Sequence, residues 1–309
     1  MVEIRVPGST SNLGAGFDTL GLALRVYLRV RVEKLNANAT THQVTVEGVD
    51  ASLIPADESN LIVRAMHFAG EREGVAVPKV RLWIENHIPV ARGLGGSGAA
   101  IVAGLTAFEA MTGCVLGEEK LLAYAYALEG HADNVTPSVV GSLVLTCPTE
   151  DGKVRYLQAE WPRELKIVAV VPKVPLATET ARRVLPERIP LQDVVFNLQR
   201  AALFWPALVH RRFELVREAM RDRVHQPYRQ ELVPGLAEVL QLRDIDGLVG
   251  VALSGAGPTV IAIASSNFQK IAEELSAGFE RNGVSADALI LDVDANGRTV
   301  SRSEIGEEA

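Results

Sequence analysis

Apolar and polar side chains alternate along Leu24–Glu33, with a leucine or valine at every second position. A period of two over this length predicts a strand with one buried face. Shorter apolar runs at Val44–Val46 and Val80–Ile84 predict neighbouring strands. Between these two runs, apolar residues recur at helical spacing along Asn60–Glu73, which predicts a helix.

Further along the chain, helical spacing predicts helices at Ala99–Thr112 and Glu118–Leu128, and Gly113 is a plausible end for the first of them. The second half alternates predicted helices (Leu191–Val209, Phe213–Met220, Gly235–Leu242 and Phe268–Arg281) with predicted strands (Ile167–Val171, Leu248–Leu253, Thr259–Ile263 and Ala288–Val293). The pattern is a mixed α+β one. A turn signal at Cys147–Gly152 precedes the domain boundary, which we place near residue 160. Residues 1–160 then form the first predicted domain and residues 161–309 the second.

Composition narrows the class of protein. The chain has 309 residues, which is enough for two ordinary domains. A net charge of −7 argues against a nucleic-acid partner, because phosphate backbones attract basic surfaces. No run of about 18 apolar residues is present, so no membrane span is predicted. With only two cysteines and no apolar signal core in Met1–Pro7, we expect a cytoplasmic protein.

The most informative segment is glycine-rich and runs from Pro89 to Ala100. Four glycines within six residues allow backbone N–H groups to turn toward one point, and a predicted helix begins directly afterwards. The start of a helix favours an anion, because its first N–H groups are unpaired and its dipole is positive there. A flexible loop that only starts a helix is the alternative. The four glycines, Arg92 and the apolar helix favour a phosphate site.

Two common phosphate motifs do not fit this segment. Residues 93–98 formally match G-x-G-x-x-G, but Asn86–Arg92 separate them from the preceding predicted strand. The acidic residues that follow, Glu118 and Glu119, begin a helix instead of ending a second strand. No Gly-Lys-Ser/Thr sequence is present, so the Walker pattern is also absent. The segment therefore predicts a phosphate-binding loop of a third kind.

Three other segments contain candidate binding or catalytic residues. Pro7–Asp18 is small, polar and glycine-rich, and follows a short predicted strand; by itself it could be a connecting turn. Glu129–Asn134 places four polar side chains after a predicted helix. A helix end at Gly130 followed by a new N-cap would explain only part of this cluster. Ser254–Pro258 joins two predicted strands and, taken alone, is an ordinary turn.

Together, the four segments resemble the GHMP family of small-molecule kinases. Pro7–Asp18, Pro89–Ala100 and Ser254–Pro258 look like that family's three motifs, in the same order. Within the family the resemblance is closest to the homoserine kinases, through Asn12–Asp18, Glu129–Val135, Ala177–Arg182 and His225–Arg229. It covers roughly residues 2 to 293. The chain departs from the usual homoserine kinase pattern at Ala15, Gly96, Gly98, Ala132 and Ala177.

The resemblance implies an α+β, two-domain GHMP kinase fold. Its first domain would be similar to ribosomal protein S5 domain 2 and its second domain ferredoxin-like. It implies that ATP, with Mg²⁺, and the small-molecule substrate L-homoserine share the cleft between the domains, and that no nucleic acid or membrane is involved. A homodimer is a further expectation of the resemblance.

The resemblance also implies roles for individual residues. Those implied for ATP are Asn60, Pro89, Val90, Ala91, Arg92, Gly93, Leu94, Gly95, Gly96, Ser97, Gly98 and Ala99, and those for Mg²⁺ are Ser97 and Glu129. Asn60 is equally expected to be the N-cap of the helix that follows it. The residues implied for homoserine binding are Asn12, Asp18, Asn134, Thr178, Arg182 and Arg229. Those implied for catalysis are Asp133, His131 and Arg182. Asp133 could act as a general base or only by positioning the substrate.

Two other functions remain open from the sequence. One is a GHMP kinase that phosphorylates a different alcohol. The other is a non-catalytic nucleotide-binding protein of the same fold, although such a protein would be expected to lose its metal ligands, and Ser97 and Glu129 are both present.

Overall fold

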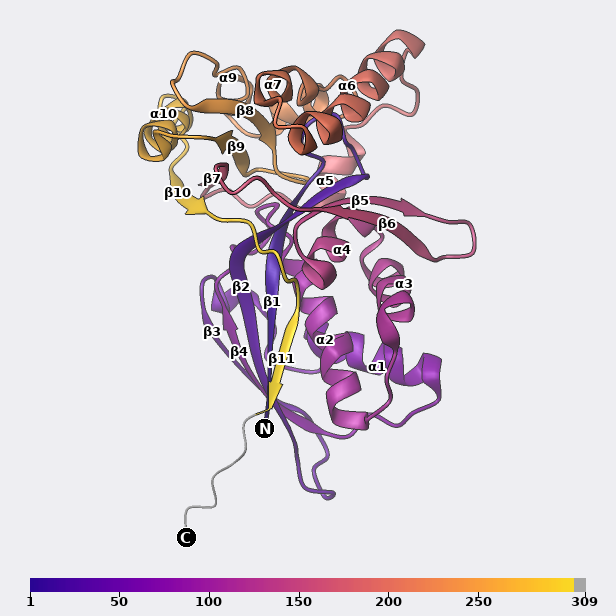
Figure 1. Ribbon diagram of the computed structural model, residues 1–309. Helices are drawn as coiled ribbons and strands as arrows, with labels where there is room; N and C mark the ends of the chain where they lie inside the picture. Colours follow the sequence, from indigo (N-terminus) through magenta and orange to yellow (C-terminus); the bar gives the residue numbers. More distant parts are fainter. Residues whose placement is uncertain (303–309) are drawn as a thin grey trace.

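The computed structural model describes residues 1–302 and contains two β-sheets, one in each half of the molecule (Figure 1). Residues 303–309, the end of the second predicted domain, lie outside the described part. No helix of the described residues is long and apolar enough to cross a membrane.

The first sheet has seven strands, with the order β11-β1-β2-β4-β3 and a hairpin, β5–β6, attached to β2. Its strands are β1 (Val2–Ser11), β2 (Leu20–Lys34), β3 (Gln43–Gly48), β4 (Val80–Asn86), β5 (Leu143–Pro148), β6 (Val154–Ala159) and β11 (Thr299–Arg302). The alternation that predicted a half-buried strand is confirmed in β2, where Arg25, Arg29 and Arg31 are exposed and the valines between them are buried.

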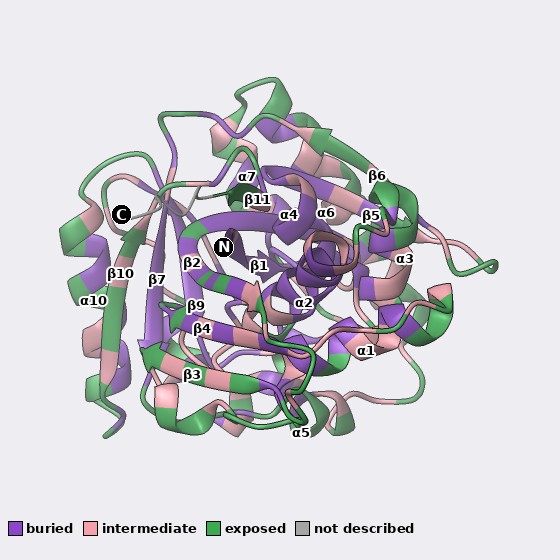
Figure 2. Cartoon of the chain, turned by 90° about the horizontal axis from the view of Figure 1, so that it is seen from below, coloured by how far each residue is buried: buried purple, intermediate pink, exposed green. Residues whose placement is uncertain are grey.

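Helices α1 (Leu61–Glu73), α2 (Gly96–Thr112), α3 (Gly117–Glu129) and α4 (Ala132–Val140) lie on one side of this sheet (Figure 1). Helix α2 is at the centre, and Leu105 and Phe108 on it are fully buried. A Cβ atom at Gly104 would lie 2.4 Å from the Ile62 carbonyl oxygen, so this glycine permits the close approach of α2 to α1. Figure 2 shows the buried residues concentrated along β1, β2 and α2.

The second sheet consists of β7 (Lys166–Pro172), β8 (Leu248–Leu253), β9 (Val260–Ala264) and β10 (Ala286–Leu291). Its order is β10-β7-β9-β8, and all neighbouring strands are antiparallel. Numbered along the chain this is 4-1-3-2, the arrangement of a ferredoxin-like fold, as predicted. The helices of this half are α5 (Thr178–Arg183), α6 (Leu191–Val209), α7 (Val216–Ala219), α8 (Gln226–Arg229), α9 (Leu236–Val239) and α10 (Phe268–Glu280).

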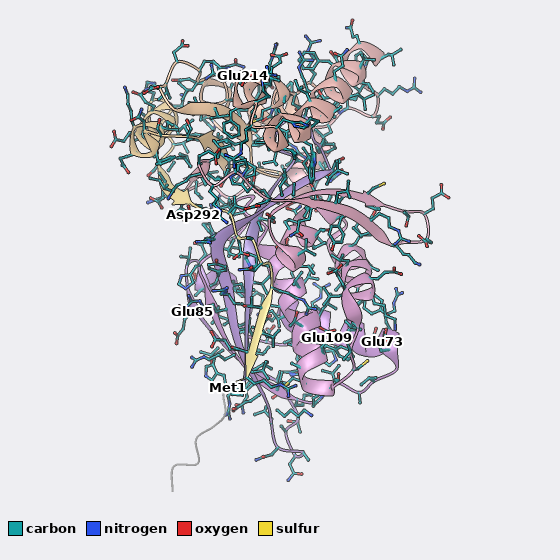
Figure 3. All side chains as sticks on the ribbon, in the orientation of Figure 1. Met1, Glu73, Glu85, Glu109, Glu214 and Asp292 are labelled. Carbon is teal, nitrogen blue, oxygen red and sulfur yellow. The ribbon has the colours of Figure 1, made fainter. Side chains whose placement is uncertain are left out.

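The end of the described chain returns to the first sheet, where β11 pairs with β1. Arg298 stabilises the position of this last segment, because its Nη1 donates to Thr106 Oγ1 (2.8 Å) and to Glu109 Oε2 (2.9 Å) on α2. Glu109 is labelled in Figure 3. The predicted boundary near residue 160 falls between β6 and β7. The division into two domains remains a prediction, and β11 belongs to the first sheet although it follows the second one in the sequence.

Two local predictions were wrong, and one helix was not predicted. Strand β1 continues to Ser11, because Pro7–Ser11 pairs with β2, so much of the predicted Pro7–Asp18 loop is strand. Helix α2 begins at Gly96 instead of Ala99, with Gly95 as its N-cap at a φ of 70°. Residues 132–140 form helix α4, which includes Pro137 and which no apolar periodicity indicated.

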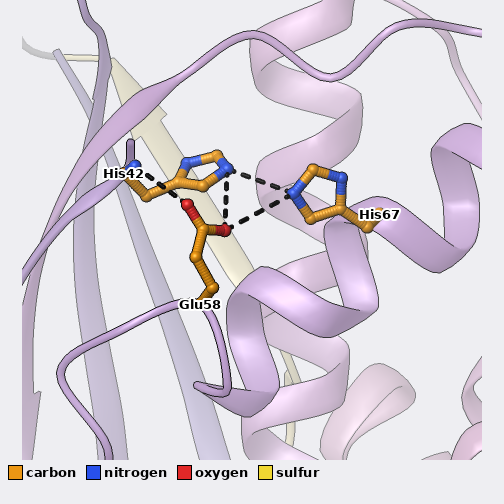
Figure 4. A group of neighbouring side chains, drawn as sticks. All are labelled: His42, Glu58 and His67. Carbon is orange, nitrogen blue, oxygen red and sulfur yellow. Dashed lines mark hydrogen bonds and ion pairs between the residues drawn. The ribbon is translucent and has the colours of Figure 1, made fainter. Parts of the chain in front are cut away.

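A cluster of His42, Glu58 and His67 joins the segment before β3 to helix α1 (Figure 4). The two Nε2 atoms are 3.1 Å apart, and Glu58 Oε2 lies 3.7 Å and 3.9 Å from them. The Val80 N–H donates to His42 Nδ1 (3.2 Å), so a neutral His42 carries its proton on Nε2. A metal ligand would need a lone pair on Nε2. The cluster is therefore a hydrogen-bonded link, and burial lowers the pKa of His42 and favours its neutral form.

Candidate active site

Three segments that are far apart in the sequence meet where the two sheets approach each other. Ser254 Oγ lies 2.8 Å from Thr10 Oγ1 and 2.5 Å from the Gly93 carbonyl oxygen. The Ser9 N–H donates to the Leu94 carbonyl (3.0 Å). The structure thus brings together the three segments that the sequence analysis singled out, and they form the floor of a cavity.

This cavity has a volume of about 360 Å³, which suits a small-molecule ligand. Every predicted site residue except Gly98 and Ala99 lines it: Asn12, Asp18, Asn60, Pro89, Val90, Ala91, Arg92, Gly93, Leu94, Gly95, Gly96, Ser97, Glu129, His131, Asp133, Asn134, Thr178, Arg182 and Arg229. Residues from both halves of the chain therefore share one cavity.

One end of the cavity contains the start of helix α2. The first hydrogen bond within this helix runs from the Ala99 N–H to the Gly95 carbonyl (2.9 Å). The amides of Gly96, Ser97 and Gly98 therefore have no partner within the helix and are suited to bind an anion. The Ala99 amide is already paired, so it cannot donate to a phosphate as the sequence analysis expected.

Gly95 is expected to tolerate no side chain. A Cβ atom there would lie 2.1 Å from Ser9 Oγ, and its φ of 70° disfavours any L-residue. We expect Gly95→Ala to raise the KM for ATP and to lower the free energy of unfolding by more than the ~1–2 kcal/mol of left-handed strain alone. Steady-state kinetics and chemical denaturation measure both effects.

Gly74→Ala is the matched control, because Gly74 has a φ of 66° with no atom within 4 Å of an added Cβ. Gly74→Ala should lower the free energy of unfolding only by the left-handed strain and should leave the KM for ATP unchanged. If the two variants behaved alike, the packing of Gly95 against Ser9 would not be what shapes the loop.

A pair of oxygen donors lies beside the start of α2. Ser97 Oγ donates to Glu129 Oε1 at 2.7 Å, from the first turn of α2 to the last residue of α3. Burial raises the pKa of Glu129, and the hydrogen bond from Ser97 opposes this shift. A hydroxyl and a carboxylate oxygen at this separation are the donors that Mg²⁺ prefers, with phosphate oxygens and waters completing the shell. The two predicted metal ligands thus fit a magnesium ion.

Two guanidinium groups, those of Arg182 and Arg229, also line the cavity. Arg182 Nη2 donates to Asp18 Oδ1 (2.7 Å). Arg229 is only 2 % exposed and donates to the carbonyl oxygens of Ala181 (3.1 Å) and Gly255 (3.0 Å). With two cations and, among residues 1–302, one carboxylate bonded to them, this part of the cavity favours an anionic group of a ligand.

Phe17 lies against both of these arginines, with their guanidinium carbons 5.5 Å and 5.3 Å from the centre of its ring. Such contacts fix the orientation of a guanidinium group and add cation–π attraction. The sequence analysis missed this role, although Phe17 belongs to the Asn12–Asp18 segment that it quoted.

Asp133 lies in the first turn of α4 and is 1 % exposed. Burial, with the nearby charge of Asp18, raises its pKa from 3.8 to about 7. Its Oδ1 atom is buried and has no hydrogen-bond partner among residues 1–302. A buried carboxyl group with one unpaired oxygen and a pKa near neutral pH, in the wall of a cavity, has the properties of a catalytic group.

His131 is the N-cap residue of α4 and faces the same cavity. Its Nδ1 lies 3.1 Å from the Glu129 carbonyl oxygen, which can only accept, so the ring carries a proton on Nδ1. Burial and the charge of Arg182 lower the pKa of His131, so the neutral form is favoured. Gly130, which precedes it at a φ of 81°, ends helix α3.

Two of the predicted ligand-binding side chains are already engaged within the protein. Asn60 caps helix α1, because its Oδ1 accepts the Ile62 N–H (2.9 Å) and its Nδ2 donates to the Pro55 carbonyl (2.6 Å). The expectation of a helix cap is confirmed. Asn12 Oδ1 accepts the Asp18 N–H (2.9 Å) and Nδ2 donates to the Gly255 carbonyl (2.9 Å). Both side chains shape the wall of the cavity.

The sequence analysis also missed an apolar wall of the cavity, which includes Leu53, Ile54, Leu61, Ile84 and Ile88. No sequence signal distinguishes these residues from ordinary core residues, because they have the same periodicity and composition. Their contribution depends on the loops that leave one side of them uncovered.

Comparisons with known proteins agree with this architecture. Family models described as the GHMP kinases N terminal domain and the GHMP kinases C terminal match residues 60–142 and 205–281. A homoserine kinase of Desulfitobacterium hafniense is 40 % identical over 301 residues, which are 97 % of this chain and 100 % of that protein. The chain belongs to the GHMP kinase family. A homoserine kinase of Persephonella marina is also 40 % identical, over 96 % of this GHMP kinase and 97 % of the relative.

Solved structures of GHMP kinases have the same fold. The crystal structure of a homoserine kinase from Cytophaga hutchinsonii matches with a TM-score of 0.83 and 25 % identity, and the match covers 97 % of each chain. A mevalonate kinase from L. major matches with a TM-score of 0.70 over 94 % of this chain and 95 % of the other, at 16 % identity. The α+β GHMP kinase fold that the sequence predicted is therefore confirmed for this chain.

Proposed function

We propose that this GHMP kinase is a homoserine kinase, which transfers the γ-phosphate of ATP to the hydroxyl of L-homoserine and gives O-phospho-L-homoserine in threonine biosynthesis. Relatives with that name that match nearly the whole chain at 40 % identity support the proposal. The structural observation that carries it is a single cavity lined by helix-start amides, an oxygen pair and two arginines.

ATP fits this arrangement along the length of the cavity. Its adenine would contact the apolar wall near Ile54 and Leu61, and its phosphates would accept from the free amides at the start of α2. Ser97 and Glu129 would hold Mg²⁺ beside those phosphates. The bound metal would neutralise the negative charge that develops on the transferred group.

Homoserine has a carboxylate, an ammonium group and a terminal hydroxyl, and the part of the cavity with the two arginines complements each of them. Arg182 and Arg229 would bind the carboxylate through charge-assisted hydrogen bonds. Asp18 and Asn134 would accept from the ammonium group, and Thr178 lies on the same wall. This placement directs the hydroxyl toward Asp133 and His131.

Asp133 is proposed to accept the proton of the substrate hydroxyl. A carboxyl group with a pKa near 7 is partly ionised at neutral pH and is a strong enough base to assist the transfer. His131 would remain neutral and position the hydroxyl. Alignment of the substrate by the two arginines would supply the rest of the rate enhancement, because phosphoryl transfer depends mainly on geometry and charge.

A direct assay tests the proposed function. The purified protein, ATP and Mg²⁺ are incubated with L-homoserine, L-serine, mevalonate and galactose in parallel, and ADP release and product mass are measured. We expect O-phosphohomoserine with a kcat/KM at least tenfold above that for any other acceptor. A clear preference for another alcohol, or ATP binding without turnover on the whole panel, would overturn the proposal.

Glu129→Gln tests the proposed metal ligand. Replacing the carboxylate with a neutral amide should raise the Mg²⁺ concentration needed for half-maximal activity by roughly tenfold or more, since even outer-shell changes cost metal sites 10–100-fold. Titration of Mg²⁺ at a fixed ATP concentration measures this. Glu119→Gln, on the same helix and paired with Lys153 on the surface, is the matched control and should leave the titration unchanged. Equal midpoints in all three proteins would exclude Glu129 as a ligand.

A cytoplasmic location and a homodimer are also part of the proposal. The location rests on the cysteine content of the chain, and the homodimer rests on its family resemblance. Light scattering of the purified protein tests the homodimer.

A further inference from the structure

A second cavity, of about 200 Å³, lies in the C-terminal half of the molecule. Residues of α6, α7 and β8 line it, together with the segments that follow α7 and α9. Gly250 on β8 forms part of its wall, and a Cβ atom there would lie 2.4 Å from the sulfur of Met220. The volume suits a small metabolite and is too small for a nucleotide.

Four arginines line this cavity, namely Arg217, Arg221, Arg223 and Arg243. Two of them have carboxylate partners: Arg221 pairs with Glu218 and Arg223 pairs with Asp193. The one carboxylate in the lining, Asp222, is already engaged, because its oxygens accept from Asn197 Nδ2 and from three backbone amides that follow it.

The other two arginines bond only to uncharged groups among the described residues. Arg217 donates to the Leu248 carbonyl (2.9 Å), and Arg243 donates to the carbonyls of Leu240 and Leu242 (both 2.7 Å). Burial, together with the charges of Arg217 and Arg221, lowers the pKa of Arg243, so both of these cations lie close enough to repel it. A protein with a net charge of −7 thus keeps an excess of positive charge around one cavity.

We propose that this cavity is a second ligand site, which binds the oxyanion group of a small phosphorylated or dicarboxylate metabolite between Arg217 and Arg243. Each guanidinium group has five N–H donors in a planar fork that matches phosphate and carboxylate oxygens. A bound oxyanion would supply the negative charge that the cluster lacks. Gln226, Gln230 and Gln241 also line the cavity and can bind the remainder of such a ligand.

The cavity and the active site share a layer of residues, because Gln226 lines the former and Arg229 lines the latter. The backbone of Met220 contacts Gly14, where an added Cβ would lie 2.0 Å from the Met220 carbonyl oxygen. Gln226 Oε1 accepts the Leu253 N–H (2.7 Å), and residue 226 begins α8, which carries Arg229 at its other end. A ligand that orders this layer would therefore stabilise the position of Arg229 and is expected to favour homoserine binding.

Calorimetric titration with inorganic phosphate tests the site directly, at constant ionic strength and with a non-hydrolysable ATP analogue present to occupy the nucleotide loop. The double variant Arg217→Gln/Arg243→Gln should bind phosphate at least tenfold more weakly than the wild type, as expected for the loss of charge-assisted hydrogen bonds. Arg163→Gln, a fully solvated arginine outside the cavity, is the matched control and should bind like the wild type. Equal affinity in the double variant would overturn the proposal.

Two further arms complete the test. Arg217→Lys/Arg243→Lys keeps both charges and should give intermediate affinity with a normal thermal melt, which separates loss of binding from loss of folding. A parallel titration with succinate shows whether a dicarboxylate binds as phosphate does. If neither probe bound to the wild type, the proposal of a second site would be overturned. These measurements do not depend on turnover, so they are independent of the proposed kinase activity.

The coupling to the active site rests on the proposed function and is measured separately. Phosphate should lower the KM for homoserine of the wild type by about twofold or more, and it should leave the KM of the double variant unchanged. An unchanged or raised KM in the wild type would overturn the coupling.

Discussion

Replacing Asp133 with asparagine is expected to lower turnover by about 10²–10⁴-fold, the usual contribution of a general base, while making the folded protein more stable at neutral and alkaline pH. The carboxyl group is 1 % exposed, and its Oδ1 has no partner within the described chain. An ionised group in such a place is costly, and an isosteric neutral amide removes that cost. A residue that destabilises the fold and yet is essential for activity has a functional role.

The effect on stability has a definite dependence on pH. The unfolded chain loses the Asp133 proton near pH 3.8, whereas the folded protein keeps it until about pH 7. The wild type therefore loses stability as the pH rises from about 4 to about 7, and the loss is complete above pH 7. A pKa raised from 3.8 to about 7 corresponds to a loss of roughly 4 kcal/mol in the free energy of unfolding.

Chemical denaturation of wild type and Asp133→Asn at several pH values measures this difference. The variant should be more stable at pH 8, and the two proteins should converge near pH 4. The kcat/KM of the wild type should fall as the pH drops below about 7, because the base becomes protonated. Asp292→Asn, at an exposed site (Figure 3), is the control and should change neither quantity. Near-normal turnover in Asp133→Asn would remove this residue from the mechanism.

Much of the fold could be predicted because local patterns were consistent with it. Strand β2 alternates cleanly, helix α6 has the predicted bounds, and the glycine-rich segment does precede a helix. Helix α4 was not predicted, because its nine residues include Pro137, and packing against β1, β2 and α2 stabilises its conformation.

The site could be predicted where a residue's role depends on a motif, and less well where it depends on tertiary geometry. Ser97 and Glu129 were named from the sequence, and their oxygens are 2.7 Å apart. Asn12 was also named, but its side chain bonds within the protein, to Asp18 and to Gly255. The contact with Gly255 spans 243 positions of the chain. The raised pKa of Asp133 depends on burial by several elements, which no short segment encodes.

Replacing Arg229 with leucine is expected to raise the KM for homoserine by about a hundredfold, since hydrogen bonds to charged groups contribute ~1.5–3 kcal/mol each. The KM for ATP should change less, because the hydrogen bonds of Arg229 go to Ala181 and Gly255 and not to the glycine-rich loop. Arg229 also bonds to the carbonyls of Ala181 and Gly255, which would lose a buried partner. Some loss of stability is therefore expected as well, and a thermal melt of each variant measures it.

Two comparisons separate substrate binding from folding. Arg229→Lys keeps a charge in the buried site and should recover part of the homoserine affinity, since an ammonium group still attracts the carboxylate but cannot form the planar fork. Arg183→Leu removes an exposed arginine from the neighbouring helix α5, where it pairs with Glu179, and should leave both KM values unchanged. If Arg229→Leu kept a normal KM for homoserine, the carboxylate of the substrate would have to bind elsewhere, and the orientation that directs its hydroxyl toward Asp133 would be wrong.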